Sequence, residues 1–157
     1  MSTLVATNIK HASSSSNNLV LNSNGSVTGA GKILQVVQTA KTDTASVQAT
    51  ATSPADIGLS CSITPSATTS KILVNCSIMT SSGTSFGLYV FLLRGSTQIM
   101  LSDASGSRTR CSRYITTYSD HSTDNYKIEQ SDLNFLDSPS TTSAITYKLQ
   151  FGCWNNN

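Results

Sequence analysis

The residue types that most often carry enzyme chemistry are scarce in this chain. It has one glutamate, Glu129, and two histidines, His11 and His121, and it contains neither a His-x-x-x-His nor a Cys-x-x-Cys spacing. Serines are plentiful, but no Gly-x-Ser-x-Gly turn presents one as a nucleophile, and nothing in the sequence orients His121 as its base. Glycoside cleavage needs two positioned carboxylates, and aspartates alone would have to supply both. The sequence predicts that the protein is not an enzyme.

The polar stretch from Thr117 to Tyr126 holds the only cluster with the look of a metal site. Asp120, His121 and Asp124 lie within it, but one imidazole and two carboxylates on a loop are a weak ligand set. We therefore expect no metal and no cofactor. The same stretch carries Tyr118, His121 and Tyr126 among hydroxyl side chains, a mixture that suits an exposed recognition loop. An inert solvated loop is the alternative.

Three arginines form the one basic cluster: Arg108, Arg110 and Arg113. Guanidinium groups match carboxylates in geometry, so the cluster could contact anionic glycans or a neighbouring protein. The alternative, which we favour, is that these arginines pair with Asp103, Asp120 or Asp137 and stabilise the fold.

Composition limits the partners. Of 157 residues only 11% are charged, the formal net charge is +2 and the pI is about 8.4, so no broad field draws the chain to nucleic acid or to a membrane surface. The first residues lack the features of a signal peptide, and the longest apolar run, Leu88 to Leu93, is far shorter than the roughly 20 residues of a spanning helix. We expect no nucleic-acid and no membrane partner.

Short apolar–polar runs separated by Ser, Thr, Asn and Gly turns predict an all-β chain. The expected strands lie at 33–38, 42–49, 57–63, 71–79, 86–94, 97–101, 112–117, 126–130, 131–136 and 146–152. This spacing favours an antiparallel β-sandwich, most simply a jelly roll, over residues 32–157.

The positions of Cys61 and Cys76 suggest one pairing between two of the expected strands. If the strands around 57–63 and 71–79 form a hairpin, then Cys61 faces Cys76, Leu59 faces Ile78 and both thiols lie on the core side. Buried free thiols are favoured over a disulfide, because free cysteine is among the most buried residue types.

The run from Phe86 to Leu93 does not alternate, so both of its faces are apolar and both must be covered. Another part of the same chain could cover the outer face. We favour a subunit interface in a closed homotrimer, formed by Phe86, Leu88, Tyr89, Val90, Phe91 and Leu93.

Residues 1–31 differ from the rest. They contain two short apolar runs, Leu4, Val5 and Ile9 and then Leu19, Val20 and Leu21, which are too few to form a core alone. The arm is either a flexible tail or a segment ordered by sister subunits or a docking partner, and the second reading is favoured.

Several segments together resemble a family of bacteriophage virion proteins that is common in aquatic phages such as cyanophages. They are Gly31 to Gln38, Ser62 to Val74, Ser102 to Arg110 and Leu136 to Tyr147, with the opening Met1-Ser-Thr-Leu. The resemblance covers nearly the whole chain and implies a trimeric fibre tip or knob with a head similar to the jelly rolls of the tumour-necrosis-factor and complement C1q type.

From this resemblance we expect a non-enzymatic virion protein, assembled in the host cytoplasm. The N-terminal arm would dock to other virion proteins of the tail or capsid, and the head could bind a host surface glycan. The near-absence of a shaft argues against a long fibre and favours a small knob or a capsid decoration protein. We take a short trimeric tail fibre or adhesion knob as the leading hypothesis and a trimeric capsid decoration protein as its closest rival. A soluble carbohydrate-binding lectin is the rival from another class.

Overall fold

The computed structural model describes residues 8–9, 19–21, 23, 27–28, 33–81, 87–116 and 128–153. Contacts divide the chain into two units, Met1–Val36 and Val37–Asn157. Every regular element in the described residues is a β-strand, and every pairing between two of these strands is antiparallel. The prediction of an all-β antiparallel chain is confirmed.

The first unit contains three short strands, β1 (Asn8–Ile9), β2 (Leu19–Leu21) and β3 (Val27–Thr28). They pair in the order β1-β2-β3, with Ile9 opposite Leu19 and Leu21 opposite Val27. Each of the two apolar runs predicted in the arm therefore contributes a strand.

The larger sheet of the second unit has five strands: β4 (Ala55–Ile63), β6 (Leu88–Arg94), β7 (Thr97–Ile99), β8 (Arg113–Ile115) and β10 (Ile145–Cys153). The order is β4-β10-β6, and the far edge of β6 is shared by β7 and β8. β6 is therefore an interior strand, bonded along both edges.

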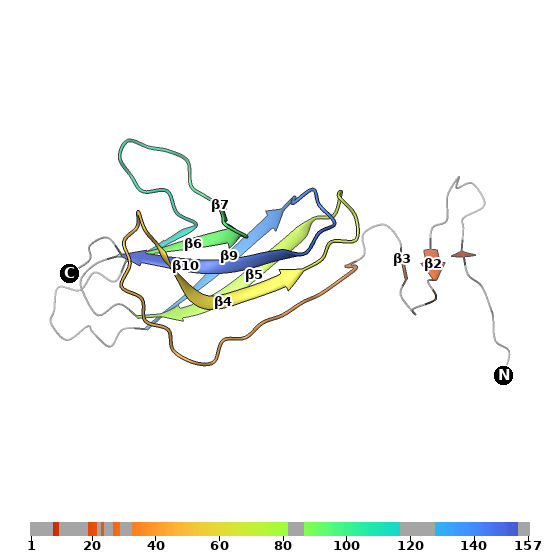
Figure 1. Cartoon of the computed structure of the whole chain (residues 1–157), viewed down its shortest axis with the longest axis horizontal. Helices are drawn as coiled ribbons and strands as arrows, with labels where there is room; N and C mark the ends of the chain where they lie inside the picture. Colours follow the sequence, from red (N-terminus) through yellow and green to blue (C-terminus); the bar gives the residue numbers. More distant parts are fainter. Residues whose placement is uncertain are drawn as a thin grey trace. The chain divides into compact units, whose positions relative to one another are not determined.

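The smaller sheet pairs β5 (Ile72–Thr80) with β9 (Glu129–Asp137) along their whole length, from Ile72 opposite Asp137 to Thr80 opposite Glu129. This sheet lies across the larger one, and the two layers face each other obliquely (Figure 1). One apolar core joins the two layers: Ile57, Ile78, Leu88, Val90, Leu92, Ile115, Leu133 and Leu149.

These two layers make a β-sandwich. Successive strands β4, β5 and β6 lie in the larger, the smaller and again the larger sheet. Two Greek keys of a jelly roll need eight strands, whereas the described part of this unit has seven, arranged five against two.

Three strand predictions differ from the structure. Residues 33–38 and 42–49 form no strand; in the second range only Ala49 bonds to a strand, its carbonyl accepting the Cys153 N–H at 2.7 Å. The two strands predicted at 126–130 and 131–136 are one strand over their described part, since continuous pairing with β5 carries β9 through Gln130 and Ser131.

The predicted hairpin between the strands of Cys61 and Cys76 is wrong. β4 pairs with β10 and β5 pairs with β9, so the connection between β4 and β5 passes from one sheet to the other. Both arrangements bury the same alternate residues, which is why the alternation could not distinguish them. All four cysteines are free and half-buried, so the thiols are present as expected, without a disulfide.

Candidate functional site

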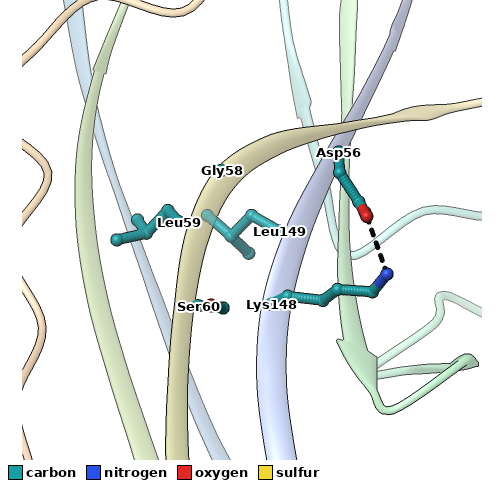
Figure 2. Close-up of a pocket in the computed structure, with 6 residues that line it drawn as sticks. All are labelled: Asp56, Gly58, Leu59, Ser60, Lys148 and Leu149. Carbon is teal, nitrogen blue, oxygen red and sulfur yellow. Dashed lines mark hydrogen bonds and ion pairs between the residues drawn. The ribbon is translucent and has the colours of Figure 1, made fainter.

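A pocket of about 90 Å³ lies on the larger sheet, where the pairing of β4 and β10 shifts. Lys148 lies opposite Ser60, but two residues later Gln150 lies opposite Asp56, so three residues of β4 face one of β10. Gly58, with a φ of 78°, makes this bulge possible because a left-handed backbone favours glycine. The pocket is the hollow that the bulge leaves (Figure 2).

The polar groups at this pocket satisfy one another. Lys148 Nζ donates to Asp56 Oδ2 at 2.8 Å, and Gln150 Nε2 donates to Asp56 Oδ1 at 2.8 Å. These bonds, the one from Lys148 first, hold the pKa of the Asp56 carboxyl below its usual range. Ligand pockets usually measure about 300–1,000 Å³, so this one is too small for a sugar ring, and we assign it no ligand.

The predicted interface strand β6 is buried by its own chain. Its inward side chains Leu88, Val90 and Leu92 belong to the core between the sheets. Its outward side chains Tyr89, Phe91 and Leu93 are between 1% and 4% exposed, because Ala51, Leu101 and Cys111 cover them.

This result corrects the interface prediction for the described members of the set. Leu88, Tyr89, Val90, Phe91 and Leu93 are at most 6% exposed in a single copy, so they offer almost no surface to a second one. The alternative, cover by another part of the same chain, is what the structure contains. Phe86 lies outside the described residues.

The segment that covers β6 is also the one that carries the arginines. Ser112 fixes its base: its backbone N–H donates to the Val90 carbonyl at 3.0 Å, and its hydroxyl donates to the Ile99 carbonyl at 3.1 Å and accepts the Leu92 N–H at 2.8 Å. The Tyr114 ring packs on Tyr89, with 4.8 Å between ring centroids. We call residues 101–113 the arginine loop; Figure 1 shows it projecting from the sheet beyond β7.

All three arginines of this loop are exposed. Arg110 Nε donates to the Ser102 carbonyl at 2.6 Å, which steadies the side chain and leaves its two terminal amino groups for other contacts. Among the described residues, Arg108, Arg110 and Arg113 form no ion pair with a carboxylate.

The favoured alternative for the arginines, internal pairing, is therefore wrong for two of its three proposed partners. Asp103 is exposed and has no arginine partner among the described residues. Asp137 pairs instead with Arg94, whose Nη1 lies 2.9 Å from its Oδ1. The third proposed partner, Asp120, lies outside the described part of the chain.

Asp137 is the centre of a buried polar group with a structural role. Besides Arg94, the Tyr147 hydroxyl donates to its Oδ2 at 2.6 Å and the Ser138 N–H donates to its Oδ1 at 2.8 Å. Burial, followed by this bond to a carboxylate, raises the pKa of the Tyr147 hydroxyl far above its usual range. The Asp137 carboxylate, on β9 of the smaller sheet, therefore links that sheet to β6 through Arg94 and to β10 through Tyr147.

The docking arm is described only in part. Ile9 lies in β1 and Leu19, Val20 and Leu21 form β2, whereas Leu4 and Val5 lie outside the described residues. The recognition residues Tyr118, His121 and Tyr126 also lie outside them.

The described residues contain neither a candidate metal site nor a candidate membrane-spanning helix. No group of three or more His, Cys, Asp or Glu side chains could hold a metal ion. No helix of that part of the chain is long and apolar enough to cross a membrane.

Sequence reasoning missed the exposed apolar residues at the boundary of the two units and on the smaller sheet. Ile33 is 76% and Val36 80% exposed, and Met79 on the outer face of β5 is 76% exposed. An aliphatic run such as Lys-Ile-Leu-Gln-Val-Val reads as a buried strand. No signal in the sequence separates it from one.

Comparison of the chain with models of protein families, with curated proteins and with solved structures gives no match.

Proposed function

We propose that this chain is a non-enzymatic structural protein of a bacteriophage virion. It would be a short trimeric tail fibre or adhesion knob, docked to the particle by residues 1–31. The observation that carries the proposal is the division of the chain into a small three-stranded unit and a larger β-sandwich. An attachment protein needs one part to bind the particle and another to face outward.

The arginine loop supports an outward recognition role for the head. Its base is fixed to β6 through Ser112 while its tip presents Arg108 and Arg110 to solvent. Exposed guanidinium groups on a rigid support suit binding to the carboxylates or sulfates of a surface glycan. A capsid decoration protein would have less use for such a tip, although its arm and sandwich could be the same.

Particle composition tests the proposal directly. We expect quantitative mass spectrometry of purified phage to find the protein in tens of copies per particle, the number that suits a tail. Hundreds of copies would move the protein to the capsid as a decoration protein. Absence from particles, together with binding to a glycan array by the free protein, would favour the lectin.

Two variants test the division of labour. Removal of residues 1–30 should leave a folded head that no longer enters particles, and incorporation at the wild-type level would contradict the docking role. The pair Arg110→Ala and Tyr118→Ala should reduce host adsorption with little change in thermal stability, since exposed substitutions usually alter stability by only about 0.5 kcal/mol. Unchanged adsorption would contradict the recognition role.

A further inference from the structure

The strongest unexplained feature of the described residues is the exposed stretch Ile33–Gln38, which we call the apolar segment. Its four aliphatic side chains are largely open to solvent: Ile33 76%, Leu34 55%, Val36 80% and Val37 40% exposed. Scattered single exposures are normal on a monomer, but four in five consecutive residues are a contiguous patch. Such a patch marks an interaction site.

The backbone of this stretch is unpaired as well. Among the described residues, positions 33–48 belong to no strand and make no backbone–backbone hydrogen bond. The chain has neither turn nor bend from residue 33 to residue 42. An extended aliphatic segment whose backbone N–H and C=O groups are unpaired can form a β-strand when a neighbouring strand edge is present.

The β-sandwich has an open side that such a strand would fit. β4 bonds to β10 along one edge and β5 bonds to β9 along one edge, so in the described residues the other edge of each strand is bare. The inward residues Leu59 and Cys61 of β4 and Val74 and Cys76 of β5 are only half-buried. We call these four residues and the bare β4 edge beside them the β4–β5 seam.

The seam contrasts with the other side of the same core. Val90 is 0% and Leu133 1% exposed, whereas Leu59, Val74 and Cys76 remain partly open although they pack against the same cluster. The core is therefore closed at β6, and the partly open residues at its margin include those of β4 and β5. Added apolar cover at the seam would be favourable by about 25 cal/mol for each Å² removed from water.

The segment that precedes β4 reaches this strand at Lys41. Lys41 lies against Gly58 in the middle of β4, with its Nζ 3.6 Å from the position a Cβ would take there. Toward the N-terminus every residue from Ala40 to Ile33 is exposed. The Leu59–Ile63 half of β4 keeps its bare edge.

An unpartnered aliphatic segment and an unfilled strand edge on one chain are complementary surfaces. The segment carries Gln35 and Gln38 between its aliphatic residues and no charge, which suits a strand covering apolar side chains and not a partner recognised by charge. A contact between two different surfaces of the same chain can close into a ring, in which every copy donates one segment and receives another.

We propose that the apolar segment of one copy adds as a strand to the β4 edge of a second copy, where its alternate side chains Leu34 and Val36 cover the β4–β5 seam. The proposal deepens the proposed function, since it places the contact between subunits of the virion protein. It replaces β6, which is buried within each copy, as the surface through which copies associate.

A charge placed in the segment tests the contact. In the full chain, Val36→Asp should weaken self-association at least tenfold, as measured by light scattering or mass photometry over a concentration series. Met79→Asp is the matched control, because Met79 is 76% exposed on the outer face of β5, away from the seam. That variant should assemble like the wild type. Thermal melts should show both heads folded.

Cross-linking locates the contact. Val36→Cys places a thiol in the segment, and Cys61 and Cys76 already lie at the seam as free thiols. After mild oxidation of a mixture of ¹⁵N-labelled and unlabelled chains, we expect disulfide peptides that join position 36 of one isotope to Cys61 or Cys76 of the other. Ser105→Cys, in the exposed tip of the arginine loop, should give no such link.

The outcomes separate this contact from the proposed function. Links within single chains only, links to Cys111 or Cys153, or assembly lost in Met79→Asp and kept in Val36→Asp would each overturn the proposed contact. A wild-type chain that is monomeric at micromolar concentration would overturn it too. The count of copies per particle, which tests the virion role, would be unaffected by any of these results.

Discussion

Two apolar runs of this chain, Leu88–Leu93 and Ile33–Val37, look alike in sequence and have opposite environments. The first lies in an interior strand, bonded on one edge to β10 and on the other to β7 and β8, with a cover on each face. The second pairs with nothing and exposes every aliphatic side chain. The more hydrophobic run, Leu88–Leu93, is the one whose two faces are covered by other parts of the same chain. The run with fewer apolar residues stays exposed to solvent.

The arginine loop explains why β6 needs no second subunit. Residues 101 and 111, at the two ends of its excursion, cover the outer face of the strand, and the Ser112 hydroxyl joins them to it. One connection therefore completes the core and presents the exposed arginines. The packing of the core and the exposure of the arginines therefore depend on the same loop.

Truncation of the buried strand should have the largest effect. Phe91 is 1% exposed, so Phe91→Ala should lower the free energy of unfolding by about 3–5 kcal/mol through lost burial and a residual cavity. Chemical denaturation of the purified chain measures the change. A loss below about 1 kcal/mol would mean that the outer face of β6 is not packed as described.

Loss of the hydrogen bond between Tyr147 and Asp137, which joins the two sheets, should have the second-largest effect on stability. Tyr147→Phe removes the hydroxyl that donates to Asp137 at 2.6 Å, and a hydrogen bond to a charged group contributes about 1.5–3 kcal/mol. Thr146→Val is the neighbouring control, because its hydroxyl bonds only to Ser62 at the surface. Equal losses in both variants would show that the bond to Asp137 has no special weight.

Alkaline pH should weaken the sandwich progressively. Burial raises the pKa of the Cys76 thiol above 9.0 and that of the Tyr147 hydroxyl above 10.0. A folded-state pKa above the unfolded one stabilises below the unfolded value, and this contribution is lost as pH rises through the folded one. The denaturation midpoint should therefore fall from about pH 9 upward. The fall above about pH 10 should be shallower in Tyr147→Phe, and an equally steep fall there would exclude Tyr147 as a cause.

The smallest effect is expected in the exposed run. Val36→Ala should change the free energy of unfolding of a monomeric head by no more than about 0.5 kcal/mol, since the side chain is 80% exposed and packs on nothing. Chemical denaturation at a concentration low enough to suppress self-association measures the free energy of unfolding of the monomer alone. A loss comparable to that of Phe91→Ala would mean that the segment is part of the folded head.

The sequence by itself determined the strands whose alternation is strict. The runs around Ile57 to Ile63, Ile72 to Ile78 and Tyr147 to Phe151 were predicted to within two residues, because a half-buried strand must place apolar side chains at every second position. The low share of charged residues, 11%, was also readable from composition. These features are local, and local patterns determine them.

Only the tertiary structure decided which strands pair and what covers each apolar face. β4 and β5 alternate as a hairpin would, yet they lie in different sheets, because pairing depends on strands far apart in the sequence. The cover of Phe91 comes from Ala51, Leu101 and Cys111, which no local pattern assigns to it. The exposure of Ile33 and Val36 likewise follows from the absence of a neighbouring strand within the chain. The burial of a residue depends on its neighbours in space, so a run of apolar residues in the sequence does not determine it.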